Sequence, residues 1–136
     1  MQEVADLAVV GGGAAGLACA VTASRLGLKV TVIERTDRCG SKLAVTGGGK
    51  GNFTHAEPPR TMAGRFDCDA RFIMPLLRKF PYQRIIQFFS SLGVEARTDD
   101  DGCVWRCNLQ RNPRIQSFHA LAHGIRVREP MQVVPD

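Results

Sequence analysis

Hydrophobic and polar positions along the first third of the chain predict a strand, a helix and a second strand. An apolar run covers Ala5–Val10 and ends at a glycine, as expected of a strand buried on both faces of a parallel sheet. Small and apolar residues continue over Ala14–Leu26, and Gly27 follows as a helix stop. The β-branched stretch Lys29–Glu34 predicts the second strand. A strand, helix and strand in this order form a right-handed parallel βαβ unit, so we expect an α/β fold.

The pattern after this unit predicts a long connection and then two helices. Residues 35–59 are polar and glycine-rich, and so long a connection is better explained by ligand contact than by packing. Helices are predicted over Ala70–Phe80 and Tyr82–Leu92, separated by Pro81.

A small β-hairpin is expected next. Its strands are Val94–Arg97 and Cys103–Arg106, joined by the turn sequence DDDG. After Asn108 the periodicity fades. Residues 109–136 are therefore treated as a basic tail with no predicted secondary structure.

Length and composition narrow the class of protein. The 136 residues fit one domain, and 44% hydrophobic with 23% charged residues is typical of a soluble globular chain. No stretch reaches the roughly 18 apolar residues that a membrane span needs, so no membrane partner is expected. Five widely spaced cysteines, an odd number, and acidic residues near the N-terminus indicate reduced thiols and a cytoplasmic protein.

The net charge of +5 would be compatible with binding to nucleic acid. From Cys103 to Asp136 the chain has five arginines against two acidic residues. This segment has no aromatic interleaving beyond Trp105 and Phe118 and no nucleic-acid reading motif, so nucleic acid is not expected as a partner.

The sequence GGGAAG, which follows the first strand, matches the dinucleotide-binding fingerprint. Gly11 permits the tight turn, Gly13 lets the backbone approach a pyrophosphate, and Gly16 lets the helix pack on the sheet. Ala14 and Ala15 begin the helix, whose free N–H groups and positive dipole end would face the phosphates. The alternative is a βαβ unit whose glycines serve packing only.

Glu34, at the end of the second strand, completes the fingerprint. A carboxylate there accepts hydrogen bonds from both hydroxyls of an adenosine ribose and repels a 2′-phosphate. FAD or NAD is therefore favoured over NADP at this site. Arg35 either lies over the adenine or is solvated, and the sequence leaves both open.

The second glycine cluster, GSKLAVTGGGKGNFTH, resembles the signature that follows the first βαβ unit in the YhiN/BaiN-like family of bacterial NAD(P)/FAD-dependent oxidoreductases. The matching positions are Lys42, Leu43, Thr46, Gly47, Gly48, Gly49, Asn52 and Thr54. The resemblance implies an FAD at the N-terminal, glutathione-reductase-like Rossmann unit, with this loop along the flavin. A flexible surface loop is the alternative.

The chain departs from that family at several places. Ser41 stands where the family usually has arginine, and Gly51 where cysteine is common, which puts a thiol beside the flavin in doubt. The resemblance resumes at Phe88–Val104 but fails at Cys103, which replaces an arginine. Family members are much longer, so the fold is expected to be incomplete relative to the family. A frameshift or a truncated product is one hypothesis for the tail.

Other chemistry is not supported. The sequence lacks a CxxC pair, so disulfide exchange is not expected. His119 and His123 share a helical face but lack the glutamate of HExxH and a third ligand, so no metal site is predicted.

The sequence thus predicts a partial FAD/NAD(P)-binding Rossmann domain over residues 1–108. The favoured function is a flavoprotein oxidoreductase, or its N-terminal part, that transfers hydride between a nicotinamide cofactor and an unidentified substrate. The cofactor is FAD, with NADH or NADPH as candidate reductant, and no catalytic residue is assigned. The alternative is a non-catalytic dinucleotide-binding module, or a fragment that needs a homo-oligomer or a C-terminal portion to act.

Overall fold

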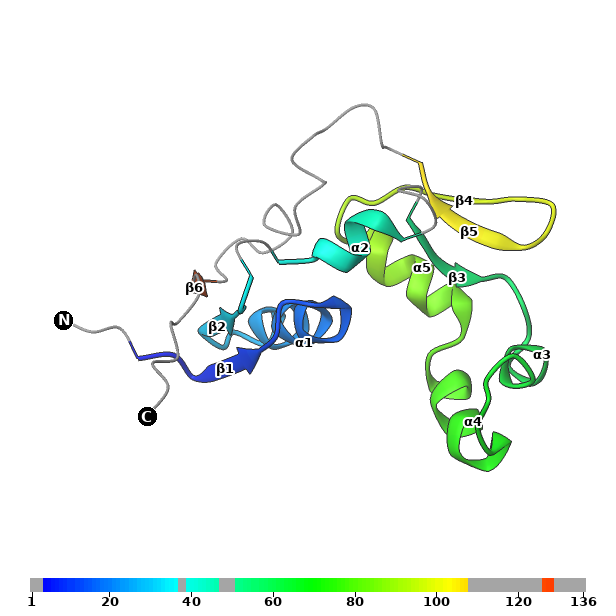
Figure 1. Cartoon of the computed structure of the whole chain (residues 1–136), viewed down its shortest axis with the longest axis horizontal. Helices are drawn as coiled ribbons and strands as arrows, with labels where there is room; N and C mark the ends of the chain where they lie inside the picture. Colours follow the sequence, from blue (N-terminus) through cyan, green and yellow to red (C-terminus); the bar gives the residue numbers. More distant parts are fainter. Residues whose placement is uncertain (1–3, 37–38, 47–50, 108–125, 129–136) are drawn as a thin grey trace. The chain divides into compact units, whose positions relative to one another are not determined.

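The computed structural model describes residues 4–36, 39–46, 51–107 and 126–128. The chain divides into two compact units, which are treated separately (Figure 1). Unit 1 comprises Met1–Thr46 with Gln110–Asp136, and unit 2 comprises Gly47–Leu109.

Unit 1 contains the predicted βαβ unit. It consists of β1 (Leu7–Val10), α1 (Ala14–Arg25) and β2 (Val30–Ile33), with the two strands parallel. A short strand β6 (Arg126–Arg128) pairs in parallel with the other edge of β2, which gives the sheet order β1-β2-β6. In a Rossmann sheet the third strand also lies beside the second. The predicted α/β fold class is confirmed.

The core of unit 1 lies between the sheet and α1. Val9, Val30 and Val32 point into it from the strands, and Leu17 and Ala20 meet them from the helix. Val32 and Ala20 are completely buried. The small side chain at position 20 lets the helix lie close to the sheet, where apolar burial contributes about 25 cal/mol per Å².

The glycine turn between β1 and α1 depends on two missing side chains. Gly11 has φ +98°, in the left-handed region that favours glycine, and its amide donates to the Ile33 carbonyl at 2.8 Å. A Cβ at position 16 would overlap the Gly11 carbonyl oxygen. The turn therefore keeps α1 against the sheet only with glycine at both positions.

Unit 2 is a three-stranded antiparallel sheet with helices. Its strands are β3 (Asn52–His55), β4 (Ala96–Thr98) and β5 (Cys103–Arg106), in the order β3-β5-β4. Its helices are α3 (Pro59–Ala63), α4 (Ala70–Lys79) and α5 (Tyr82–Ser90). Helix α5 packs on β3 and β4, and the Phe53 and Phe89 ring centroids lie 4.6 Å apart.

The carboxylate of Asp99 closes the β4–β5 hairpin. Its Oδ1 accepts from the Cys103 amide at 2.8 Å, and its Oδ2 accepts from Trp105 Nε1 at 2.6 Å. These bonds favour the charged form, so the pKa of Asp99 lies below its ordinary value, with the Trp105 bond as the largest cause.

The sequence predicted some elements of unit 2 and missed others. The two helices and the hairpin are present: α4 and α5 begin as predicted and end one and two residues early, β4 is shifted by one or two residues, and β5 has the predicted bounds. The connection over residues 35–59 was expected to be one irregular loop. It instead contains α2 (Ser41–Val45), which belongs to unit 1, and β3. Helix α3 was not predicted. Strand β6 lies in the segment predicted as a tail, and the domain boundary at residue 108 stays a prediction.

Among the described residues, no helix is both long and apolar enough to cross a membrane.

The substitution Gly16→Ala tests the close packing of the glycine turn. Alanine gains about 1 kcal/mol of helix propensity over glycine, but the overlap with the Gly11 carbonyl costs about 3 kcal/mol. We expect unit 1 to lose stability, measured as faster native-state hydrogen exchange at the amides of β1 and β2. Gly13→Ala is the matched control, because its Cβ meets nothing within 4 Å. Equal exchange in the two variants contradicts the packing argument.

The substitution Asp99→Asn tests the hairpin closure. A carboxyl group whose pKa is lowered on folding contributes stability above its unfolded value, and that contribution is lost as pH falls through the folded value. Trp105 is the sole tryptophan, so its fluorescence reports on unit 2 during urea unfolding. We expect the wild type to exceed the variant in free energy of unfolding at about pH 7, with the difference shrinking at about pH 3. A difference that does not change with pH speaks against a charged Asp99 in this role.

Candidate nucleotide-binding site

A cavity of about 430 Å³ lies in unit 1, where β1 and β2 end. The carboxyl ends of parallel strands are where α/β sheets bind their ligands. Three segments line the cavity: the glycine turn, the end of β2 and helix α2. The lining residues are Gly12, Gly13, Ala14, Glu34, Arg35, Thr36, Gly40, Ser41, Lys42, Leu43 and Thr46.

Glu34 is held at the edge of this cavity by the backbone on both sides. Its Oε2 accepts from the Gly12 amide at 2.6 Å. Its Oε1 accepts from the Thr36 amide at 2.9 Å and from the Thr36 hydroxyl at 3.0 Å. The bonds from Thr36 and then Gly12 lower the pKa of Glu34, so the group is a carboxylate at neutral pH. Each carboxylate oxygen can accept more than one hydrogen bond, so capacity is left for a ligand.

The N-terminus of α1 is suited to an anion. Gly13 is its N-cap, and no side chain caps the helix there. The first turn carries no acidic residue, and a Cβ at position 13 would meet nothing within 4 Å among the described residues. The first N–H groups of a helix and its dipole favour negative charge, and α1 itself contributes no acidic side chain there to repel it.

Cys39 supports the glycine turn from behind. Its side chain is 2% exposed, and a Cβ at position 12 would overlap its sulfur. The Gly40 amide donates to the Gly12 carbonyl at 2.8 Å, which fixes the two segments together. Burial and, secondarily, the Glu34 charge raise the pKa of the Cys39 thiol. A neutral, buried thiol is a packing group and a poor nucleophile.

Helix α2 brings cationic and hydroxyl groups to the cavity. It begins after Gly40, whose φ of +73° lies in the left-handed region, and it carries Lys42. The Thr46 hydroxyl donates to the Lys42 carbonyl at 2.9 Å and closes the helix. With Arg35 on the opposite segment, the cavity combines one carboxylate with two cations, which suits a ligand that has both ribose hydroxyls and phosphates.

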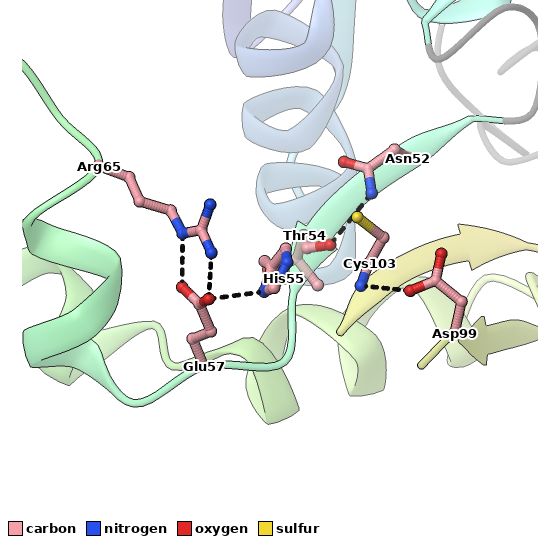
Figure 2. A network of polar contacts seen from close by, with 7 residues as sticks. All are labelled: Asn52, Thr54, His55, Glu57, Arg65, Asp99 and Cys103. Carbon is pink, nitrogen blue, oxygen red and sulfur yellow. Dashed lines mark hydrogen bonds and ion pairs between the residues drawn. The ribbon is translucent and has the colours of Figure 1, made fainter. Parts of the chain in front are cut away.

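Unit 2 contains a separate polar network (Figure 2). The Glu57 carboxylate forms a two-point ion pair with Arg65 and lies 3.3 Å from His55 Nδ1. The Arg65 guanidinium lowers the pKa of Glu57. This network ties the end of α3 to β3 and serves the architecture of unit 2. No group of three or more metal-ligating side chains occurs in the part of the chain that the structure describes.

The structure brings together half of the predicted site residues. Those that line the cavity are Gly13, Ala14, Glu34, Arg35, Lys42, Leu43 and Thr46. Gly11, Ala15 and Gly16 shape the turn without lining the cavity. Gly47, Gly48 and Gly49 lie outside the described residues, as do His119 and His123. Asn52 lies in unit 2, where its side-chain amide donates to the Thr54 carbonyl at 3.4 Å.

The sequence prediction missed four residues of the lining: Gly12, Thr36, Gly40 and Ser41. Thr36 had a local signal, because a threonine two residues after a carboxylate can donate to it from both backbone and side chain. Gly40 had the weaker signal of a glycine before a helix. Gly12 is not among the predicted residues, because the fingerprint does not require a glycine at the middle position of the triplet.

Two curated relatives match part of the chain. A ribosomal RNA dihydrouridine synthase from Haemophilus influenzae is 31% identical over 94 residues, which cover 69% of this chain and 23% of that protein. A ribosomal RNA dihydrouridine synthase from Escherichia coli K12 is 38% identical over 54 residues, which cover 40% and 14%. The matched region is therefore less than a quarter of each relative.

Two solved structures share the fold. The 3-ketosteroid-Δ4-(5α)-dehydrogenase from Rhodococcus jostii RHA1 matches with a TM-score of 0.63 at 20% identity, over 93% of this chain and 38% of that one. THI4 from Thermovibrio ammonificans matches with a TM-score of 0.54 at 17% identity, over 92% and 38%. At these identities the likeness concerns the fold alone.

The model of one protein family, described as the HI0933-like protein Rossmann domain, matches residues 5–133. The match continues well beyond Val104, where the sequence resemblance was expected to fail, so the hypothesis of a frameshifted tail loses its support. The narrower YhiN/BaiN-like assignment stays a prediction. On this match the chain belongs to the HI0933-like Rossmann-domain family.

Proposed function

We propose that the chain is the nucleotide-binding part of an FAD-dependent oxidoreductase, and that the cavity of unit 1 holds the adenosine diphosphate half of FAD. The observation that carries this proposal is the Glu34 carboxylate, fixed by Gly12 and Thr36 beside an uncapped helix N-terminus. A carboxylate and a helix N-terminus next to each other match the ribose and pyrophosphate of a dinucleotide.

Each group in the cavity has a role in this proposal. Glu34 accepts hydrogen bonds from the ribose hydroxyls, and its charge disfavours a 2′-phosphate. The open side of Gly13 leaves room for a phosphate close to the backbone. Lys42 and Arg35 supply positive charge for the remaining phosphate oxygens.

A bound flavin supplies hydride transfer, while the protein supplies binding and orientation. NADH or NADPH is the proposed reductant. The non-catalytic module remains the alternative, because the cavity described here accounts for the nucleotide end of the cofactor and includes no group assigned to catalysis.

The two curated relatives point to a substrate for the whole protein. Both are named ribosomal RNA dihydrouridine synthases. We propose that the whole protein reduces uracil in ribosomal RNA: a hydride and a proton add to the 5,6 double bond, and a reduced nicotinamide is oxidised. This proposal opposes the expectation that nucleic acid is not a partner, which rested on the charge, the aromatic residues and the motifs of residues 103–136.

Flavin retention tests the cofactor. The purified chain is mixed with FAD, passed through a gel-filtration column, and its absorbance recorded in the flavin bands. We expect retained flavin. Bleaching on anaerobic addition of NADH or NADPH supports a complete redox site, whereas retained flavin that does not bleach favours the binding module. A folded chain that retains no flavin contradicts the proposal.

Glu34→Gln tests the ribose contact. A hydrogen bond to a charged group is worth about 1.5–3 kcal/mol, so we expect ADP affinity to fall about 10- to 150-fold. Affinity for 2′-phospho-ADP falls less, because the repelling charge is removed. Isothermal titration with both ligands measures the ratio of the ADP affinity to the 2′-phospho-ADP affinity in the wild type and in the variant. A constant ratio means that Glu34 does not face the ribose.

Gly13→Ala tests the phosphate approach in the same titration. The added methyl fills the open side of the turn without strain, since φ at this residue is −79°. We expect at least a tenfold loss of ADP affinity in a folded chain. Gly64→Ala is the matched control, because Gly64 lies in unit 2 with φ −68° and an ordinary contact of 3.5 Å to the Thr61 carbonyl. Equal affinity of the two variants counts against a phosphate at Gly13.

A further inference from the structure

Helix α4 has one partly buried side and one solvent-exposed apolar side. Phe72, Leu76 and Phe80, each four residues apart, form an exposed line along the helix and its C-cap, which we name the α4 stripe. Their exposed fractions are 71%, 49% and 51%. The adjoining side, with Ile73 and Leu77, is half-buried, and α3 packs against the helix. Within unit 2, Figure 1 shows α4 beside α3 and away from the β3-β5-β4 sheet.

Cations accompany the exposed rings in a repeated order. The chain reads Arg-Phe at residues 65–66, Arg-Phe at 71–72 and Arg-Lys-Phe at 78–80. Phe66 is also exposed, at 45%. The Lys79 ammonium lies 5.9 Å from the centroid of the Phe80 ring. Exposed aromatic rings therefore alternate with positive charge over this whole segment.

The charge of the segment is only partly compensated. Residues 59–90 contain six cationic side chains against two acidic ones, a net charge of +4. Arg65 pairs with Glu57, and Arg71 pairs with Asp69. Arg78 and Lys79 stand in the last turn of α4, where Lys79 projects beside the stripe and Arg78 projects to the other side of the helix. Whatever covers the stripe must therefore combine negative charge with apolar, preferably flat, surface.

A second copy of the chain fits this requirement poorly. The α4 helix of a second copy carries cations and no acidic side chain, so it cannot supply the negative charge, and like charges repel. A single-stranded nucleic acid fits it well. Bases stack on aromatic side chains for about 1–3 kcal/mol each, and phosphates pair with neighbouring cations. From Phe72 to Phe80 the helix rises about 12 Å, against roughly 3.4 Å for one stacked nucleotide, so the stripe can engage more than one base.

We propose that the α4 stripe, with Phe66 and Lys79, is a binding surface for an unpaired segment of RNA. The inference rests on the proposed function in its choice of RNA over other polyanions. It goes beyond that function by assigning contact with the RNA to unit 2, apart from the nucleotide cavity. The exposed rings hold the bases without reading their sequence, and the cations track the backbone.

The test uses the 136-residue chain and a fluorescein-labelled, uridine-rich single-stranded RNA of about 12 nucleotides. Fluorescence anisotropy at several salt concentrations gives the affinity. We expect Phe72→Ala to weaken binding about 5- to 150-fold. In the variant Lys79→Gln, the slope of log affinity against log salt should fall by about 0.7. These side chains are exposed, so both variants should keep the Trp105 emission of the wild type.

Two substitutions serve as matched controls. Leu26→Ala removes an apolar side chain that is 77% exposed in unit 1. Arg97→Gln removes an exposed cation from β4, elsewhere in unit 2. Both should bind the RNA like the wild type. Losses as large as those of the α4 variants would show non-specific attraction and would overturn the proposal.

The remaining outcomes separate this proposal from the proposed function, because flavin retention is measured on the same samples. A chain that retains FAD but binds no RNA at low salt overturns the RNA surface alone. A chain that binds RNA through the stripe without retaining FAD supports the surface and contradicts the flavin proposal. Self-association that Phe72→Ala abolishes, or tighter binding to phosphatidylserine vesicles than to RNA, assigns the stripe to another partner and overturns the proposal.

Discussion

The hydrogen bond from the Gly12 amide to the Glu34 carboxylate joins the carboxyl ends of β1 and β2, and the candidate nucleotide cavity depends on it. It requires β2 to end where Glu34 faces the glycine turn, and it requires a turn tight enough to present that amide. Thr36 holds the other carboxylate oxygen, so the side chain is fixed from both directions. Cys39 fills the space behind Gly12 and leaves no room for a side chain there.

This constraint also sets the electrostatics of the site. Backbone amides lower the pKa of Glu34, while the burial of Cys39 and the nearby carboxylate raise the pKa of the thiol. The site therefore presents one fixed negative charge and keeps the sulfur neutral. The positive end of α1 lies next to this carboxylate, because Glu34 Oε2 accepts from the amide of Gly12, one residue before the N-cap. A carboxylate beside a helix N-terminus favours binding of a ligand with separate ribose and phosphate groups.

The sequence predicted the parts of the fold whose information is local. The apolar runs of β1 and β2, the glycine turn and Glu34 carry their own signals, because buried parallel strands and tight turns restrict residue type directly. Short elements such as α2, α3 and β3 carry no such local signal, because a segment of four or five residues shows no reliable periodicity. Strand β3 forms because β5 pairs with it, and β6 forms because β2 offers a free edge. The sequence of β3 or of β6 alone does not predict which strand it pairs with.

Chain topology connects the cavity with unit 2. The sheet of unit 1 is formed by strands that precede and follow unit 2 in the sequence, so unit 2 is inserted between β2 and β6 and attached at both ends. Residues 35–46, which supply much of the cavity lining, are also the chain that leads from β2 towards unit 2. The contacts of the nucleotide and the surface proposed for RNA thus belong to neighbouring parts of one continuous chain, with separate side chains for each.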